Sequence, residues 1–570
     1  MQKFLKKKGY QYLLMFASFL VFSCYSASAT EYYVTTPGEI TSVMYVAQPG
    51  DTLTMANGVW TDAHIVFEGN GTEDQPILLR SESPGCVILS GSSNLRIAGD
   101  YLIVDGLYFK NGYSSSGGVI EFRNGSSNLS NYCRLTNTAI ENYNPADANI
   151  NYKWVSLYGS HNRVDHCYFK GKNNIGTTLV VWFERTSDPP AHYHLIDHNY
   201  FAHRPELGQN GGETIRIGTS TYSMSDSYTI VEHNYFEYCN GEAEIISNKS
   251  CENIYRYNTF YECEGALTLR HGNRCTVYGN FFIGNRKSNT GGVRVIGEDH
   301  TIYNNYFCGL YGSSFKSALP VLNGVPNSPL NRYFQVKNAL IVFNTFFDCK
   351  YTMIIGAGAD DERTLPPEDC IIANNLVKTN YRVIRQKAVP INMTWEGNIM
   401  QGSSLGIPQP EGITIIDPQL VLAEDGLWRP AEFSPAIGTA TGDYDFVIDD
   451  MDGQPRDDGQ KDIGCDEFSD VPIVNRPLTR SDVGPDWINS LALPVTLIVT
   501  KKGSCSGNVL LNPAGGIYDV GTVVTLTALP GRNCTFNGWS GDLTGTANPD
   551  SIIMDSHKRV TATFASPPSR

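Results

Sequence analysis

Short runs rich in Ile, Val, Tyr and Phe recur along the chain, and many of them end in the pattern Asn-x-Phe. Residues 195–201 form one copy, and further copies begin at Asn234, Asn258, Asn280, Asn305 and Asn344. From Phe236 onward, successive phenylalanines are 24, 22 and 25 residues apart. Such a period is typical of leucine-rich repeats or of a β-solenoid. Because the Leu-x-x-Leu-x-Leu pattern is absent and the runs favour strands, we predict an all-β, right-handed parallel β-helix.

Each period of this pattern is expected to form one coil of the solenoid. A single coil cannot bury its own inner face, so coils stacked at about 4.8 Å supply the core. We expect the repeated asparagines to form a ladder at a bend, with a structural role. Cys239, Cys251, Cys263 and Cys275 recur every 12 residues, about half a coil, and are predicted to be buried interior residues.

The ends of the chain differ from the repeat. Residues 1–29 carry a lysine-rich start, an apolar stretch at 13–22 and the small residues Ala27-Ser28-Ala29, which predict a signal peptide. The apolar stretch is too short to span a bilayer. We therefore expect no membrane span, and a secreted, periplasmic or cell-surface protein. Lipid anchoring at Cys24 is the alternative.

Three further segments follow from composition. Residues 30–468 are predicted to be the β-helix domain, 469–494 a Pro-containing linker and 495–565 a separate small β module. Cys505 and Cys534 form a candidate disulfide in that module. Residues 443–468 are rich in Asp and Gly but lack the ligand spacing of an EF-hand. We predict them to be the last coil and a solvated closing turn.

Net charge limits the partners. The formal charge is −15, and removal of the four lysines in the signal peptide changes it to −19. This balance argues against nucleic acid and anionic membranes. It leaves an anionic polysaccharide open, because a local basic groove can lie on an acidic protein.

Six polar residues occupy equivalent positions after the Asn-x-Phe of four consecutive coils. They are Asn210, Glu242, Glu244, Lys249, Arg270 and Arg294. Lys249 and Arg270 are 21 residues apart, and Arg270 and Arg294 are 24 apart, each close to one coil. Residues one coil apart are neighbours in a solenoid. We therefore expect these side chains to line one groove.

Glu242 and Glu244 are two residues apart, so in a strand they point to the same face. Two such carboxylates repel each other unless a cation lies between them. With Asn210 they offer an oxygen set suited to Ca²⁺. The alternative is a pair of exposed glutamates balanced by Arg216 and Lys249. Glu213 either supports the ligands from outside the ion's own coordination sphere or is an ion-pair partner of Arg216.

Three strings, at residues 210–218, 242–250 and 269–274, resemble the active-site strands of polysaccharide lyase family 6. This family contains alginate lyases and the dermatan-sulfate lyase chondroitinase B, and the similarity covers residues 32–468. The resemblance implies Ca²⁺ on Asn210, Glu242 and Glu244, with Lys249 as base and Arg270 as acid. It also implies substrate contacts for Arg216, His271 and Arg294. Residues 495–565 resemble an internalin-type B repeat, which implies a spacer or a contact with the cell surface.

The resemblance implies calcium-assisted β-elimination on a uronic-acid polysaccharide, with alginate preferred and dermatan sulfate as the alternative. A β-helix glycoside hydrolase would need positioned acidic residues flanking the bond, whereas this groove presents Lys and Arg. A third possibility is a non-catalytic, carbohydrate-binding surface protein. Release of unsaturated uronate ends would distinguish the three classes.

Overall fold

The computed structural model describes residues 29–566, apart from 115–116, 186–188, 458, 492–494, 519–521 and 555–556. The predicted signal peptide lies outside the described residues except for Ala29. Among the described residues, no helix has the length and apolar character that a bilayer crossing requires.

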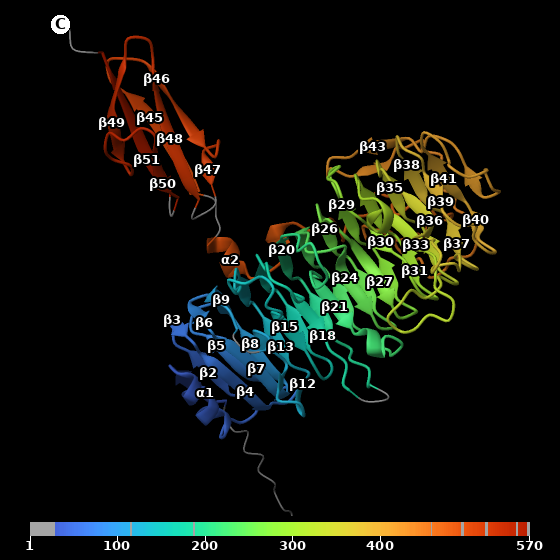
Figure 1. Ribbon diagram of the computed structural model, residues 1–570, viewed down its shortest axis with the longest axis horizontal. Coiled ribbons are helices and arrows are strands. Elements are labelled where there is room, and N and C mark those ends of the chain that lie inside the picture. Colours follow the sequence, from blue (N-terminus) through green and yellow to red (C-terminus); the bar gives the residue numbers. More distant parts are fainter. Residues whose placement is uncertain are drawn as a thin grey trace, which may run out of the picture.

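Three long parallel sheets run along the main body of the protein (Figure 1). Two of them have 14 described strands each, from β1 (Glu31–Val34) to β40 (Thr394–Glu396) and from β3 (Gly58–Thr61) to β42 (Ile413–Thr414). The third has 11 described strands and includes β15 (Val155–Leu157), β18 (Leu179–Val181), β21 (Ile215–Gly218), β24 (Glu244–Lys249), β27 (Ala266–His271) and β30 (Val293–Arg294). The predicted parallel β-helix is confirmed.

The Asn-x-Phe repeat explains the regular stacking of the coils. The phenylalanine rings of neighbouring coils stack inside, as between Phe260 and Phe282, whose centroids are 4.6 Å apart. The asparagines form the predicted ladder, because the Asn234 side-chain amide donates to Asn258 Oδ1 at 3.0 Å and the pattern continues coil by coil. The residue before each asparagine, such as Tyr257 at φ 55°, has left-handed backbone. The asparagine therefore satisfies buried backbone groups at a tight bend.

A short helix closes the N-terminal end of the β-helix. Helix α1 (Pro37–Met44) begins with Pro37 after the N-cap Thr36, whose side chain accepts a hydrogen bond from the Glu39 backbone N–H. Ile40 on this helix is fully buried in the core that the coils share. The helix thus covers apolar surface that the first coil would otherwise expose to water.

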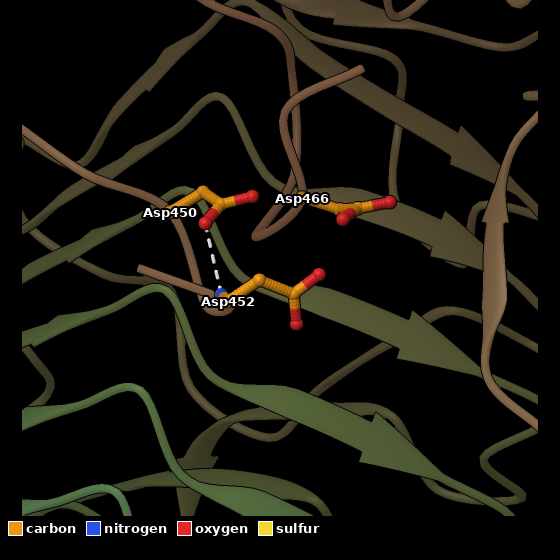
Figure 2. A group of neighbouring side chains, drawn as sticks. All are labelled: Asp450, Asp452 and Asp466. Carbon is orange, nitrogen blue, oxygen red and sulfur yellow. Dashed lines mark hydrogen bonds between the residues drawn. The ribbon is translucent and has the colours of Figure 1, made fainter. Parts of the chain in front are cut away.

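The prediction of a last coil and a solvated closing turn at residues 443–468 is wrong. The last strand of the long sheets is β42, and the Asp-rich segment folds back along the coils, where Met451 and Cys465 pack against Phe281 and Tyr306. Five of its carboxylates are buried rather than solvated, those of Asp450, Asp452, Asp462, Asp466 and Glu467. Asp450, Asp452 and Asp466 are 1%, 0% and 5% exposed, and Figure 2 shows their side chains gathered in one place.

Arginines make this burial of charge tolerable. Arg429 forms ion pairs with both Asp452 and Asp466. Arg456 pairs with Glu467 while both side chains are almost completely buried, at 0% and 2% exposure. Buried charges persist in proteins when they are paired in this way. These partners could not be predicted from the repeat, because the pairs join residues at irregular distances along the chain.

The segment predicted as a linker also packs against the β-helix over much of its length. Asn475 donates to the Gly279 carbonyl at 3.5 Å, and Trp487 in helix α2 (Asp486–Leu491) donates to the Asn137 carbonyl at 2.9 Å. Val483 and Ile488 lie against a row of tyrosines on the coils, namely Tyr108, Tyr168, Tyr200 and Tyr235. The segment therefore shields apolar ring surface from water.

The C-terminal module has a core of its own. Its strands run from β45 (Val495–Lys502) to β51 (Lys558–Ala565), and they bury Trp539, Val560 and Phe564 among others. Cys505 and Cys534 form the predicted disulfide. Cys239, Cys251, Cys263 and Cys275 are free and buried, as predicted.

Candidate active site

The six residues expected to share a groove all line one cavity of about 530 Å³. Strands β21, β24, β27 and β30 are consecutive neighbours in the third sheet, and their register places Gly218 beside Lys249 and Lys249 beside His271. The pairing of β24 with β27 shifts by one residue between Asn248 and Lys249. Such irregularities re-aim side chains at functional sites. Here Lys249 and Arg270 both line the cavity.

One wall of the cavity is acidic. Glu213, Glu242 and Glu244 line it, together with Asn210 from the loop before β21. Burial raises the pKa of Glu242 to about 8, and the nearby charges of Glu213 and Glu244 add to the rise. The backbone N–H of Gly211 donates to Glu242 Oε2 at 3.2 Å, which favours the ionised form but does not offset the burial. Three crowded carboxylates with an amide oxygen are a donor set that fits Ca²⁺.

Three basic residues, Lys249, Arg270 and Arg294, line the same cavity. Arg294 Nη1 and Arg270 Nε lie 3.4 and 3.6 Å from Glu244 Oε1. Lys249 Nζ lies 4.0 Å from Glu213 Oε1, so among the described residues the ion pair of Glu213 is with Lys249. Backbone carbonyls hold the Arg270 guanidinium, since Nη1 donates to the Arg332 carbonyl at 2.9 Å. The site therefore sets fixed cations directly beside carboxylates.

The cavity is also lined by Phe315, Lys316 and Tyr333, which the Asn-x-Phe repeat did not allow us to predict. Phe315 and Lys316 lie between β32 (Tyr306–Cys308) and β33 (Leu319–Leu322), and Tyr333 lies in the longer loop between β33 and β34 (Leu340–Val342). The Tyr333 ring lies 4.2 Å from the Arg270 guanidinium carbon, and the Phe315 ring lies 4.3 Å from that of Arg294. These distances fit cation–π contacts, which orient the two guanidinium groups.

Arg216 and His271, the other predicted substrate contacts, are not among the residues that line this cavity. The Arg216 guanidinium carbon lies 4.8 Å from the Trp182 ring, and its buried Nε has no hydrogen-bond partner among the described residues. His271 is 1% exposed. Burial and the charges of Arg270, Lys249 and Arg294 lower the pKa of His271 to about 3, so the ring is neutral at ordinary pH.

The buried triad of Asp450, Asp452 and Asp466 is a second place where a metal could be held. One oxygen from each residue lies within 4.8 Å of the others (Figure 2). Arg429, however, already pairs with two of these carboxylates. A guanidinium thus supplies the positive charge there. The calcium site predicted at Asn210, Glu242 and Glu244 is a different one, in the cavity described above.

Calcium affinity should rise with pH between about 6 and 8, because Glu242 must lose a proton before it can bind a cation. In the folded protein the pKa of Glu242 is raised to about 8, so its carboxyl group is mostly neutral below that pH. The neutral form avoids a buried charge and therefore stabilises the metal-free folded protein, and this stabilisation is lost as the pH rises through 8. Affinity should approach a tenfold gain per pH unit. Calorimetric titration with calcium in buffers of different ionisation enthalpy measures both affinity and proton release. The variant Glu242→Gln is the control, and equal affinity of the wild type at pH 6 and 8 would contradict the expectation.

Comparison with known proteins identifies the families that this chain resembles. The chondroitinase B family model matches residues 34–433, and the model of the divergent InlB B-repeat domain matches residues 495–568. A search of curated proteins finds no match.

Solved structures of polysaccharide lyases are also similar to this chain. The polysaccharide lyase family 6 alginate lyase AlyGC is 38% identical with a TM-score of 0.71, and the match covers 83% of this chain and 62% of AlyGC. The chain therefore spans less than two thirds of the length of AlyGC. A mannuronic-acid-specific family 6 lyase from the human gut microbiota is 31% identical, with coverage of 68% and 91% and a TM-score of 0.60.

A family 6 polysaccharide lyase of Pseudopedobacter saltans is 26% identical, with coverage of 80% and 99% and a TM-score of 0.58. The family model alone spans well over half of the chain, and the solved structures agree with it in fold. The chain therefore belongs to the chondroitinase B family, polysaccharide lyase family 6, and carries a divergent InlB B-repeat domain at its C-terminal end.

Proposed function

We propose that this protein is an exported lyase that cleaves uronic-acid polysaccharides, with alginate as the preferred substrate, by calcium-assisted β-elimination. The observation that carries the proposal is the shared cavity in which Lys249 and Arg270 face Glu242 and Glu244. The two relatives above 30% identity support alginate, since they are described as an alginate lyase and a mannuronic-acid-specific lyase. Export is supported by the N-terminal pattern of residues 1–29.

Lys249 is assigned as the base that removes the C5 proton of the uronate. Its side chain is 18% exposed and comes from strand β24, so it reaches the cavity from a rigid element. A lysine can take up a proton only in its neutral form. Lys249 and Arg270 line the same cavity, which is the arrangement this role requires.

Arg270 is assigned as the group that assists departure of the O4 leaving group. Its guanidinium remains charged and is held by the Arg332 carbonyl, the Tyr333 ring and Glu244. A fixed cation stabilises negative charge as it develops on the leaving oxygen. Because an arginine gives up a proton reluctantly, a water molecule shares the role of proton donor.

Asn210, Glu242 and Glu244 would hold the calcium ion. When bound, the ion would neutralise the substrate carboxylate and so make the adjacent C5 proton more acidic. Arg294 lies 3.4 Å from Glu244 and is 3% exposed, so it keeps that carboxylate in place within the site. The fit between these donors and a hard cation rests on the crowding of carboxylates described above.

Dermatan sulfate is the second candidate substrate, because the matching family model is that of chondroitinase B. The test is to incubate the full chain with each polymer, with and without a calcium chelator, and to follow the ultraviolet absorbance of unsaturated uronate ends. We expect a calcium-dependent rise in this absorbance on alginate. The same assay, applied separately to the culture medium and to washed cells, tests export. A rise in reducing ends without this absorbance would mean hydrolysis, and no reaction on either polymer would mean a binding protein.

A further inference from the structure

A second hollow of about 1000 Å³ lies on the same sheet as the active site. Its walls include Arg123, Tyr158, Trp182, Arg185, Thr219 and Tyr222. Tyr158 follows strand β15, Trp182 follows β18 and Thr219 follows β21. These strands precede β24, the strand of Lys249, in the order of the sheet. The hollow therefore occupies the coils immediately beside the cavity.

Stacked rings and guanidinium groups form one wall of this hollow. The Arg123 guanidinium carbon lies 3.9 Å from the centre of the Tyr158 ring. The rings of Tyr158 and Trp182 stack with their centroids 6.1 Å apart and their planes at 11°. The Arg216 guanidinium carbon lies 4.8 Å from the centre of the Trp182 ring. Because the ring faces are covered by each other and by guanidinium groups, sugar stacking is not their main role. The rings instead hold the planar guanidinium groups in fixed orientations.

Arginine donors in this hollow remain able to take an anionic ligand. Arg185 is exposed, and no ion pair of its side chain is found among the described residues. Arg123 pairs with Glu121 at 3.1 Å but keeps its side chain 32% exposed. Arg216, between the hollow and the cavity, has a buried Nε without a hydrogen-bond partner in the part of the chain that the structure describes. A planar guanidinium suits bidentate contact with a carboxylate.

The sign of the charge changes beyond the hollow. The next depression along the sheet, of about 880 Å³, is lined by Glu68, Asp100 and Glu184. It shares Ser127, Leu129 and Glu184 with the arginine-lined hollow. A polyanion would be attracted along the arginines and repelled at this acidic end. Carboxylates therefore mark the end of the arginine-lined hollow that lies away from the cavity.

We propose that the hollow of Arg123 and Arg185 binds uronate residues of the same polysaccharide chain at a distance from the cleaved bond. This inference rests on the proposed function. Strand β15 is three coils from β24, and Arg123 lies one coil further away. The coil of Arg123 is therefore four coils, or about 19 Å at 4.8 Å per coil, from the coil of Lys249. A sugar ring in an extended chain has a length similar to one coil. The groove thus holds about four sugars on this side of Lys249, and the acidic depression marks its end.

The test compares chains of increasing length. Oligouronates from three to eight residues and the polymer are assayed with the wild type and with the double variant Arg123→Gln/Arg185→Ala. We expect the double variant to lose about 10–100-fold in kcat/KM on chains long enough to reach the hollow, through a higher KM, and little on the shortest substrates. In the wild type, the gain with length should level off once the groove is filled.

Arg382→Ala is the matched control, because it removes an exposed arginine from a distant coil. Equal activity of the double variant and the wild type at every length would overturn the inference, as would an equal loss at every length. Absence of unsaturated products from the wild type on all chains would instead overturn the proposed function, and the inference with it. A gain that continues well past the length of the groove would show that the acidic depression does not end it.

Discussion

Replacement of Lys249 by alanine is expected to lower turnover by about 10²–10⁴-fold, the usual contribution of a general base. This corresponds to about 3–5 kcal/mol of barrier height. The fold should be unchanged, because the side chain lies at the cavity and not in the core. Initial rates of unsaturated product formation, together with circular dichroism of the variant, measure both effects.

Two further variants sharpen this test. Lys249→Arg keeps the positive charge but cannot become neutral, so it should be as inactive as the alanine variant. Lys337→Ala is the matched control, since Lys337 also pairs with one glutamate, Glu368 at 3.2 Å, away from the cavity. Substantial activity in Lys249→Arg would mean that the lysine binds substrate by charge, and near-normal activity in Lys249→Ala would mean that the base is another group.

Replacement of Arg456 by methionine is expected to destabilise the β-helix by about 3–5 kcal/mol. The change removes the guanidinium that pairs with the Glu467 carboxylate, and both side chains are buried, at 0% and 2% exposure. It also removes the donors to the Asp462 and Gly464 carbonyls. The shift of the β-helix transition in urea, followed by tryptophan fluorescence, measures the effect.

The matched control is Arg80→Met, which breaks an exposed pair with Glu31 and should cost no more than about 1 kcal/mol. Adding Glu467→Gln to Arg456→Met should recover part of the loss, because the buried negative charge is then removed. A shift for Arg456→Met no larger than for Arg80→Met would show that the closing segment does not depend on this pair.

The relation of fold to sequence is clearest in the repeat itself. Phe236, Phe260 and Phe282 recur at nearly constant spacing, and the structure stacks their rings at 4.6 Å. In a solenoid each coil contacts its neighbours, so sequence spacing translates directly into spatial position. For the same reason the shared cavity of Lys249, Arg270 and Arg294 could be predicted before any coordinates were known.

The closing segment and the excursions between coils behave differently. Tyr333 and Phe315 lie beside Arg270 and Arg294, yet they belong to loops whose paths no periodicity describes. Residues 443–468 are predicted to be the last coil and a solvated closing turn, whereas Arg429 and Arg456 pair with three of their carboxylates in the interior. The partner of a buried charge depends on the course of the folded chain, and residue type alone does not reveal it.

Residue spacing was enough to predict the coil, its period, and which polar residues share one side of it, because hydrogen bonding between coils repeats a similar register at each step. The groups that surround those residues became known only from the folded chain: the ring that orients Arg270, the stack that holds Arg123, and the acidic depression beyond it. These contacts arise where loops of unequal length meet, and loop length does not specify where a loop packs.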